Sequence, residues 1–255
     1  MDTVSPLSEA EKQWQLHFER KLGELPGGRR FSTPFLDPRQ LELAEAALRT
    51  IPTLSYTVYG GYPEAERNAL NIYPAQQKGM LPEVTAVLVK WAGFESKLSH
   101  RDLLGAVLAC GLRRDQIGDI VMLQEGGAVM MVTDSQVEYI CSNLLQVGNL
   151  SVNCVATELG QLPLAKDDGK EIKGTVASLR ADAVLSLGFG ISRSRIVLLI
   201  KGGLVRVNWR PINSPSIQLK EGDQVSLKGK GRLLIYALEG ETRKGRIHLK
   251  LKKYC

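Results

Sequence analysis

A serine and two arginines lie together at residues 192–195, with side chains and spacing suited to binding an anion. Ser192 is expected to cap a helix over residues 193–201, because a serine in this position can accept a bond from a free backbone N–H group. The first turn of a helix has unpaired N–H groups and a partial positive charge, which favour phosphate oxygens. Arg193 and Arg195 would add charge-assisted hydrogen bonds at the same end.

Further cations extend this patch along the chain. Lys201 ends the predicted helix and Arg206 lies on the strand expected after it, over residues 204–208. Structured RNA presents phosphates and 2′-hydroxyls in a shallow minor groove, so a patch of this kind predicts recognition of RNA by shape.

Some of these residues have a structural alternative. Arg180 can pair with Asp182 and hold the module together, Arg193 lies near the apolar side of its helix, and Ser192 can be a cap and nothing more. Arg195 is the arginine of this helix with the better case for contact with RNA.

Charge is unevenly divided along the chain. Residues 170–255 contain 18 Lys and Arg against 6 Asp and Glu, whereas residues 1–169 contain 15 against 21. A basic part joined to an acidic part predicts a C-terminal domain that binds a polyanion, and nucleic acid is the favoured class. A solvated basic face and a surface for anionic lipid remain open as alternatives.

The basic part is expected to form a small α/β module. A helix over residues 178–187 precedes the Ser192 helix, and a turn at 221–223 leads into a strand over 224–228. Alternation predicts a last strand over residues 246–252, with Ile247, Leu249 and Leu251 inward. Its other face would carry a basic stripe of Arg246, His248, Lys250 and Lys252.

Two segments are expected before the module. In residues 1–79, helices are predicted from Glu9 and from Pro38, then a strand over 54–59, a short helix from Pro63 and a polar linker at 74–79. In residues 80–162, periodicity and capping boxes predict the order βαββαβ of a ferredoxin-like fold, which RNA-recognition motifs share. Its two central strands, 117–123 and 128–132, lack the aromatic side chains on which such motifs stack bases, so a structural or protein-contacting role is favoured.

Several classes of protein are disfavoured by composition. No apolar run approaches the roughly 20 residues of a transmembrane helix, and the first residues resemble neither a signal peptide nor a transit peptide. A cytoplasmic-type compartment is therefore expected. The four cysteines form no CxxC pair and the three histidines are far apart, so we expect free thiols, no metal and no cofactor.

The C-terminal residues resemble the S4 RNA-binding domain. The resemblance lies in Arg180–Leu185, Ile191–Arg195, Ile200–Asn208 and Glu221–Asp223, with two departures. Ala181 stands where leucine is usual, and Trp209 stands where the turn usually has glycine.

A longer resemblance covers nearly the whole chain. Phe35–Arg39, Gly60–Arg67, the turn Val207–Arg210 and the tail Gly240–Arg246 are similar to signatures of the YlmH-like S4 proteins. Within that group the chain is most similar to the photosystem II S4 domain proteins of cyanobacteria and plastids, for which Trp209 would be a feature of the subgroup. The compartment would then be the cyanobacterial cytosol or the plastid stroma.

This resemblance implies three domains, at residues 1–79, 80–162 and 171–255, of which the second is RNA-recognition-like and the third is an S4 domain. It implies binding to rRNA and tRNA at the large ribosomal subunit, with stabilisation of P-site tRNA in ribosome-associated quality control. The alternative is a photosystem II assembly or repair factor that acts through RNA, protein or membrane-surface contacts. DNA is not an expected partner.

An enzyme is not expected. The S4-linked pseudouridine synthases, methyltransferases and tyrosyl-tRNA synthetases need a catalytic or nucleotide-binding domain whose motifs the chain lacks, and no Ser-His-Asp or Cys-His set can be built from three scattered histidines.

The predicted RNA contacts are basic or polar side chains of the C-terminal module: Arg180, Ser192, Arg193, Arg195, Lys201, Arg206, Asn208, Arg210, Lys228, Lys230, Arg246 and Lys250. The Gly60–Arg67 motif is either a plain turn or a second contact with RNA through Tyr62 or Arg67.

Overall fold

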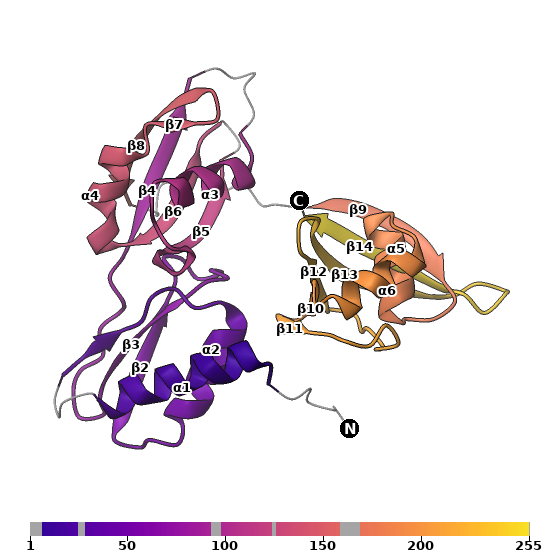
Figure 1. Cartoon of the computed structure of the whole chain (residues 1–255), viewed down its shortest axis with the longest axis horizontal. Helices are drawn as coiled ribbons and strands as arrows, with labels where there is room; N and C mark the ends of the chain where they lie inside the picture. The colour runs from indigo at the N-terminus through magenta and orange to yellow at the C-terminus, as the bar shows by residue number, and fades with distance from the viewer. Residues whose placement is uncertain (1–6, 25–28, 93–97, 124–125, 159–168, 255) are drawn as a thin grey trace. The chain divides into compact units, whose positions relative to one another are not determined.

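The structure is a computed structural model and describes residues 7–24, 29–92, 98–123, 126–158 and 169–254. The chain divides into two compact units, one over residues 9–165 and one that contains residues 166–255 (Figure 1). Residues 9–79 of the first predicted domain and all of the second, 80–162, fall in the first unit, and the predicted S4 domain falls in the second.

The first half of the larger unit packs two helices against a small antiparallel sheet. Its elements are α1 (Glu9–Gly23), β1 (Phe31–Ser32), α2 (Pro38–Leu48), β2 (Leu54–Tyr59) and β3 (Ala69–Pro74), with strand order β1-β3-β2. The predicted start of α2 is confirmed: Asp37 accepts from the backbone N–H of Gln40 over 2.8 Å, and the Gln40 side chain accepts from the Asp37 backbone over 3.0 Å.

One prediction for this half is wrong, and one strand was not predicted. No helix begins at Pro63, because residues 63–68 form turns that return the chain to the sheet. The strand β3 follows these turns and extends to Pro74, where the sequence predicted a linker to begin. Its residues are apolar and buried almost throughout, so they lack the alternation that marks a half-buried strand.

The second half of the larger unit has the predicted βαββαβ order. Its elements are β4 (Val84–Trp91), α3 (His100–Ala109), η1 (Arg114–Gln116), β5 (Ile117–Met122), β6 (Ala128–Thr133), α4 (Asp134–Asn143), β7 (Gln146–Val147) and β8 (Leu150–Thr157). The strands pair in the order β5-β6-β4-β8-β7, all antiparallel. The capping box of Ser99 and Asp102 at the start of α3 is also present.

The two faces of this sheet pack against different partners. One face and the helices α3 and α4 form a core that includes Val87, Leu103 and Ile140. On the other face, Phe35 from the first half is fully buried against Val129 and Met131. The face that would be open in an isolated RNA-recognition motif therefore takes part in packing between the two halves of this unit.

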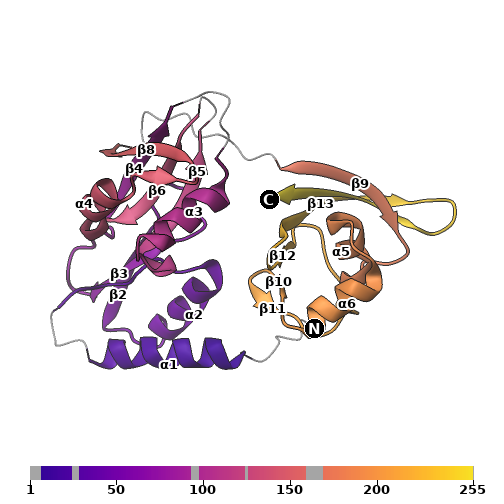
Figure 2. The ribbon, with the colours of Figure 1, turned by 45° about the horizontal axis from the view of Figure 1, so that its top comes forward.

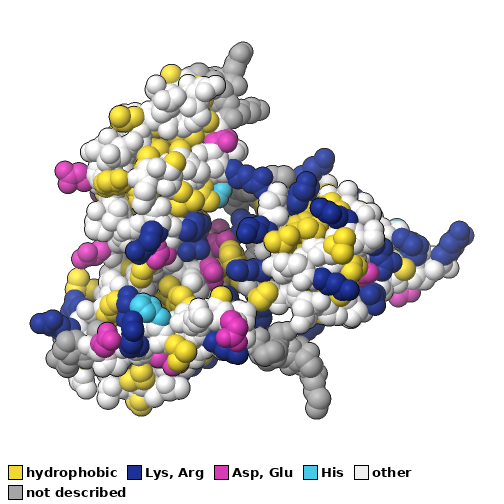
Figure 3. Space-filling model, in the orientation of Figure 1, with side chains coloured by type: hydrophobic (Ala, Val, Ile, Leu, Met, Phe, Trp, Pro, Cys, Tyr) yellow, Lys and Arg dark blue, Asp and Glu magenta, His cyan; other side chains and the backbone are white. Residues whose placement is uncertain are grey.

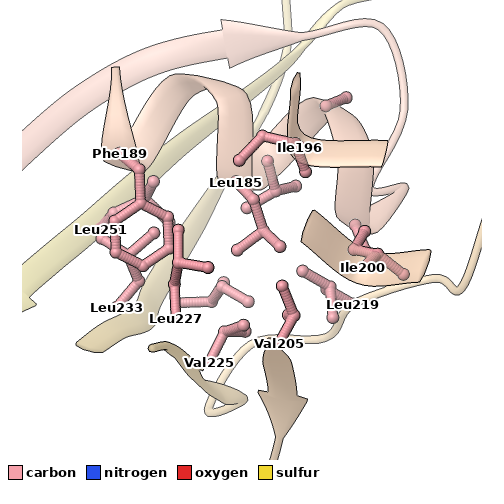
Figure 4. Packing of buried hydrophobic residues seen from close by; sticks show 14 of the residues in the cluster. Leu185, Phe189, Ile196, Ile200, Val205, Leu219, Val225, Leu227, Leu233 and Leu251 are labelled. Atoms are coloured by element: carbon pink, nitrogen blue, oxygen red, sulfur yellow. The ribbon is translucent and has the colours of Figure 1, made fainter. Parts of the chain in front are cut away.

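The C-terminal unit is a six-stranded antiparallel sheet with two helices. Its elements are β9 (Lys170–Val176), α5 (Ala181–Phe189), α6 (Arg193–Lys201), β10 (Val205–Val207), β11 (Arg210–Pro211), β12 (Gln224–Leu227), β13 (Gly231–Glu241) and β14 (Ile247–Tyr254). The strand order is β11-β10-β12-β13-β14-β9, and the two helices lie against one side of the sheet (Figure 2). Leu185, Ile196 and Ile200 from the helices meet Val205 and Leu251 from the strands in one buried core (Figure 4).

The sequence did not predict three strands of this sheet, of which β11 has only two residues. The strand β9 begins at Lys170, one residue before the predicted start of the S4 domain, and it pairs with β14 over seven residues. The strand β13 contains a bulge next to Tyr236, which breaks the two-residue alternation that would have marked it. The helices, by contrast, agree with the sequence to within a few residues at their ends.

Candidate nucleic-acid interface

The first turns of α5 and α6 are joined by one buried carboxylate. Asp182 is 5% exposed and accepts a hydrogen bond from Arg193 Nη2 over 2.6 Å and one from Arg180 Nε over 3.1 Å. Burial raises the pKa of Asp182, but the bonds from Arg193 and Arg180 outweigh it and hold this pKa below its ordinary value. The carboxylate is therefore ionised at neutral pH and compensates both guanidinium charges.

This pairing supports the structural alternative for Arg180 and Arg193. Their side chains are nevertheless 40% and 55% exposed, so each has donors left for a further partner. The two arginines hold the helices in register and border the surface at the same time.

Ser192 occupies the N-cap position of α6, but its side chain does not cap the helix. Its backbone is extended, at φ −58° and ψ 146°, and its hydroxyl lies 3.3 Å from the hydroxyl of Ser194. The predicted helix start is thus confirmed and the predicted side-chain bond is absent. The N–H groups of the first turn have no side-chain acceptor from Ser192, which leaves this helix end suited to an external anion.

Three cations near this helix are exposed and unpaired. Arg195, Lys201 and Arg206 make no hydrogen bond or ion pair within the described part of the chain, in contrast to Arg180 and Arg193. Their charges are available to a ligand without breaking an internal contact.

Two cations on the strands, Arg206 and Lys250, lie on the face of the sheet that points away from the helices. Val205 and Val207 flank Arg206 and face the core, so Arg206 lies on the side of the sheet away from the helices. Lys250 also alternates with core residues, Leu249 and Leu251, and has the same outward direction. The structure therefore does not bring all of the predicted contacts onto one surface.

Two cations of the last hairpin are already engaged. Lys250 pairs with Glu239 on the neighbouring strand β13. Arg246 Nη2 and Nε donate to the carbonyl and hydroxyl of Thr175, over 2.7 and 3.0 Å. Both residues hold strands together, and they are weaker candidates for RNA contact than Arg195.

Lys228 and Lys230 lie on the exposed turn between β12 and β13. The backbone N–H of Lys228 donates to the carbonyl of Leu204 over 2.9 Å, so this turn lies beside the segment that follows α6. The two lysines are thus placed near the end of α6 that carries Lys201.

Asn208 has a structural role in the turn between β10 and β11. Its Nδ2 donates to Asp223 Oδ1 over 2.8 Å, and its Oδ1 accepts from the backbone of Gln224 over 2.9 Å. Both ends of the amide are used, which disfavours the predicted role of Asn208 in binding RNA. Arg210 is partly buried and pairs with Val207 across this turn.

The Gly60–Arg67 motif lies where the two halves of the larger unit meet. Tyr62 donates through its hydroxyl to Asp119 Oδ2 over 2.8 Å, and Asp119 also accepts from the backbone of Glu66 and Arg67. Arg67 is 8% exposed and donates from Nη2 to the carbonyl of Phe35 over 2.9 Å. This favours the plain structural turn over the hypothesis of a second RNA contact.

Packing also explains the glycines of this motif. A Cβ on Gly61, whose φ is +104°, would lie 2.6 Å from Met131 Sδ. A Cβ on Gly60 would lie 2.4 Å from the carbonyl of Arg67. The sequence carried no signal for Asp119, the acceptor that organises the whole motif, because it lies about fifty residues away on another strand.

The described residues were also compared with the requirements of a metal site, a reactive thiol and a membrane-spanning helix. They contain no group of three His, Cys, Asp or Glu side chains that could hold a metal ion. Cys154 is buried, which raises the pKa of its thiol to about 12, whereas Cys110 and Cys141 are partly exposed free thiols and Cys255 lies outside the described residues. Within the described ranges no single helix is long and apolar enough to cross a membrane, and only α5 and α6 together, bent by 113°, reach that length and composition.

Comparison with known proteins agrees with this geometry. The S4 domain family matches residues 179–225, and the family described as the putative RNA-binding domain in YlmH matches residues 83–161. The ribosome-associated protein quality control protein P2 of Bacillus subtilis is 33% identical over 217 residues, which cover 83% of this chain and 82% of that protein. The chain belongs to the YlmH-like family.

A solved structure described as cell division protein ylmH from Streptococcus pneumoniae is also similar. It has a TM-score of 0.48 and 20% sequence identity, and the match covers 60% of this chain and 94% of that one. Membership of the YlmH-like family rests on the sequence match and not on this likeness.

The two family matches cover different segments of this YlmH-like protein. The S4 match contains α5, α6, β10 and β11, and therefore Arg195, Lys201 and Arg206. Lys228, Lys230, Arg246 and Lys250 lie beyond it. On the face shown in Figure 3, lysine and arginine side chains are spread over the C-terminal unit, including the loop between β13 and β14.

Proposed function

We propose that this protein is a non-catalytic RNA-binding protein whose S4 domain docks on structured RNA of the large ribosomal subunit. The observation that carries the proposal is the division among the cations of the S4 segment. Arg180 and Arg193 are bound to Asp182, whereas Arg195, Lys201 and Arg206 are exposed and make no internal contact among the described residues. Cations without an internal partner contribute their charge to a ligand at no cost to the fold.

The start of α6 supports the same proposal. It offers backbone N–H groups that no side chain of Ser192 satisfies, and a helix dipole that favours negative charge. Lys201 extends the positive surface to the other end of the helix. A helix with cations at both ends fits the regularly spaced phosphates of a folded RNA better than it fits a single small anion.

The relative from Bacillus subtilis suggests the setting. Its name places it in ribosome-associated protein quality control, and we propose the same process for this chain, with stabilisation of tRNA in the P site as its task. The central segment, whose family is described as a putative RNA-binding domain, would add affinity by means other than base stacking on its sheet, because Phe35 and Tyr62 pack on that face.

Binding to purified large subunits tests the proposal. Subunits with and without peptidyl-tRNA are compared for wild type and for an Arg195→Ala/Lys201→Ala/Arg206→Ala variant. We expect wild type to bind both forms and to prefer the form with tRNA, and we expect the variant to lose both. Failure of wild type to bind either form would contradict the proposal.

A matched control separates this site from general loss of charge. Arg29, Arg49 and Lys78 are exposed cations of the larger unit that lie outside both family matches, and their replacement by alanine removes the same number of charges. This control is expected to bind large subunits as wild type does.

Binding that survives nuclease treatment would instead favour the photosystem assembly alternative, in which the basic surface meets protein or lipid.

A further inference from the structure

The turn that joins β10 and β11 holds a bulky residue in a backbone conformation that favours glycine. Val207 and Arg210 pair across it, so the turn has two central residues, Asn208 and Trp209, with φ +47° and +67°. Two-residue hairpin turns with positive φ at both positions strongly prefer Asn-Gly, because the second position disfavours a Cβ. Asn208 fits this preference, whereas Trp209 carries the steric cost of the left-handed region.

Packing inside the domain does not compensate this cost. The partly buried hydrophobic residues that pack on the core of the C-terminal unit include Leu204 and Val207, but Trp209 is not among them. The other two tryptophans differ: Trp14 stacks on Phe18 with ring centroids 5.3 Å apart, and Trp91 packs on the central core. Among the described residues, no ring or cation contact to Trp209 is seen.

Hydrogen bonds hold the turn despite its strain. Asn208 is held by Asp223 and by Gln224, to which its own backbone N–H also donates over 2.8 Å. A strained residue persists where its surroundings determine the backbone, and such residues concentrate at binding sites. Trp209 is therefore presented, partly exposed, on a fixed support.

The neighbours of Trp209 indicate what it would meet. Arg206 lies on the same hairpin, where it pairs with Pro211 in the strand register, and Arg210 follows Trp209 directly. An aromatic ring near an exposed cation such as Arg206 can hold an unstacked nucleobase, because the ring stacks on the base while the cation binds the nucleic-acid backbone.

We propose that Trp209 stacks on an unpaired nucleobase next to the helical RNA that the S4 domain binds. This inference rests on the proposed function, and it adds a preference for RNA in which a base is available outside the stack. Since every base has a π face, the contact selects for an unpaired nucleotide and not for a particular sequence.

Two RNA hairpins test the proposal with the full-length protein. They are identical except that one carries a single unpaired adenosine in its stem, replaced in a parallel sample by a fluorescent adenine analogue. Wild type is expected to bind the bulged hairpin about tenfold more tightly than the paired one, from the size of base–aromatic stacking. The fluorescence of the analogue should fall on binding, because stacking quenches it.

The variants Trp209→Gly and Trp209→Phe complete the test. Trp209→Gly should bind both hairpins with the wild-type affinity for the paired one, without quenching, and its thermal stability should be unchanged or raised because glycine relieves the positive φ. Trp209→Phe should keep part of the preference. A Trp209→Gly protein that keeps the full preference, or that unfolds more easily than wild type, would overturn the proposal.

Failure of the proposed function gives a different result. If wild type binds neither hairpin in a salt-sensitive manner, then RNA binding itself is wrong and the inference has no basis. If wild type binds both hairpins equally and with the expected salt dependence, the proposed function stands and the role of Trp209 as a base-stacking residue is wrong.

Discussion

Arg193 Nη2 lies 2.6 Å from Asp182 Oδ2, so the first residue of α6 is tied to the second residue of α5. Arg195 follows two residues later, on the same helix, and makes no internal contact among the described residues. The two arginines have the same chemistry and lie in the same helical turn, but one is bound within the fold and the other is available to a ligand. This difference leads to separate predictions for the two residues.

The Asp182→Asn variant should destabilise the C-terminal unit. The neutral amide cannot accept strongly from two guanidinium groups, and we expect a loss of about 1–3 kcal/mol in the free energy of unfolding, as for other buried hydrogen bonds to charged groups. Urea denaturation, monitored by circular dichroism at neutral pH, measures this loss. An unchanged midpoint would show that the solvent-exposed parts of Arg180 and Arg193 compensate fully.

The hydrogen bonds to Asp182 also predict that the stability of the C-terminal unit depends on pH. The pKa of Asp182 in the folded protein lies below its ordinary value of about 3.9, so its stabilisation is complete above that value and is lost as the pH falls through the folded pKa. The stability difference between wild type and Asp182→Asn should therefore shrink when denaturation is repeated below about pH 4. A difference that stays constant into strong acid would contradict this assignment of charge.

Single alanine variants distinguish Arg193 from Arg195. Arg195→Ala should weaken RNA binding and lower the slope of log affinity against log salt by about one, with no change in stability. Arg193→Ala should lower stability as well, because it removes one of the two partners of Asp182. Filter binding at several salt concentrations and thermal denaturation of the same preparations give both quantities. Equal stability of the two variants would be inconsistent with the ion pair.

The sequence predicted the elements whose signals are local. The helix start at Pro38, the capping box at Ser99 and the βαββαβ order of residues 80–162 agree with the structure. What the sequence could not predict depends on partners far away in the chain. The strand β9 forms because it pairs with β14. Asp119 organises the glycine turn because folding places Tyr62 within hydrogen-bonding distance of it.

The candidate site shows the same division. Charge distribution and the helix over residues 193–201 were evident from the sequence, and so was the possible pairing of Arg180 with Asp182. The sequence could not reveal that Lys250 pairs with Glu239 and Arg246 with Thr175, or that the amide of Asn208 is used by the turn. Those facts depend on strand register, which a single sequence does not fix.

Gly61 should tolerate no side chain. Gly61→Ala would place a Cβ at φ +104° and 2.6 Å from Met131 Sδ, and we expect a loss of about 2 kcal/mol or more in the free energy of unfolding of the larger unit. Gly148→Ala is the matched control, because Gly148 also has positive φ, at +58°, but its added Cβ would meet nothing within 4 Å. It should show the backbone cost alone, about 1 kcal/mol. Equal losses would remove the argument for close packing.

The Tyr62→Ala/Arg67→Ala variant tests whether the glycine turn contacts RNA. Tyr62 bonds to Asp119 and Arg67 is buried against the carbonyl of Phe35, so we expect lower thermal stability and unchanged affinity for large subunits when binding is measured well below the melting temperature. A fall in affinity with no fall in stability would restore the hypothesis of a second RNA contact.

The most direct test of the account is the salt dependence of binding to the large ribosomal subunit by the Arg195→Ala/Lys201→Ala/Arg206→Ala variant. With three phosphate contacts removed, the slope of log affinity against log salt should decrease by about three relative to wild type, while the control variant with alanine at Arg29, Arg49 and Lys78 keeps the wild-type slope. Equal slopes for wild type and the Arg195, Lys201 and Arg206 variant would contradict the claim that these three residues contact RNA.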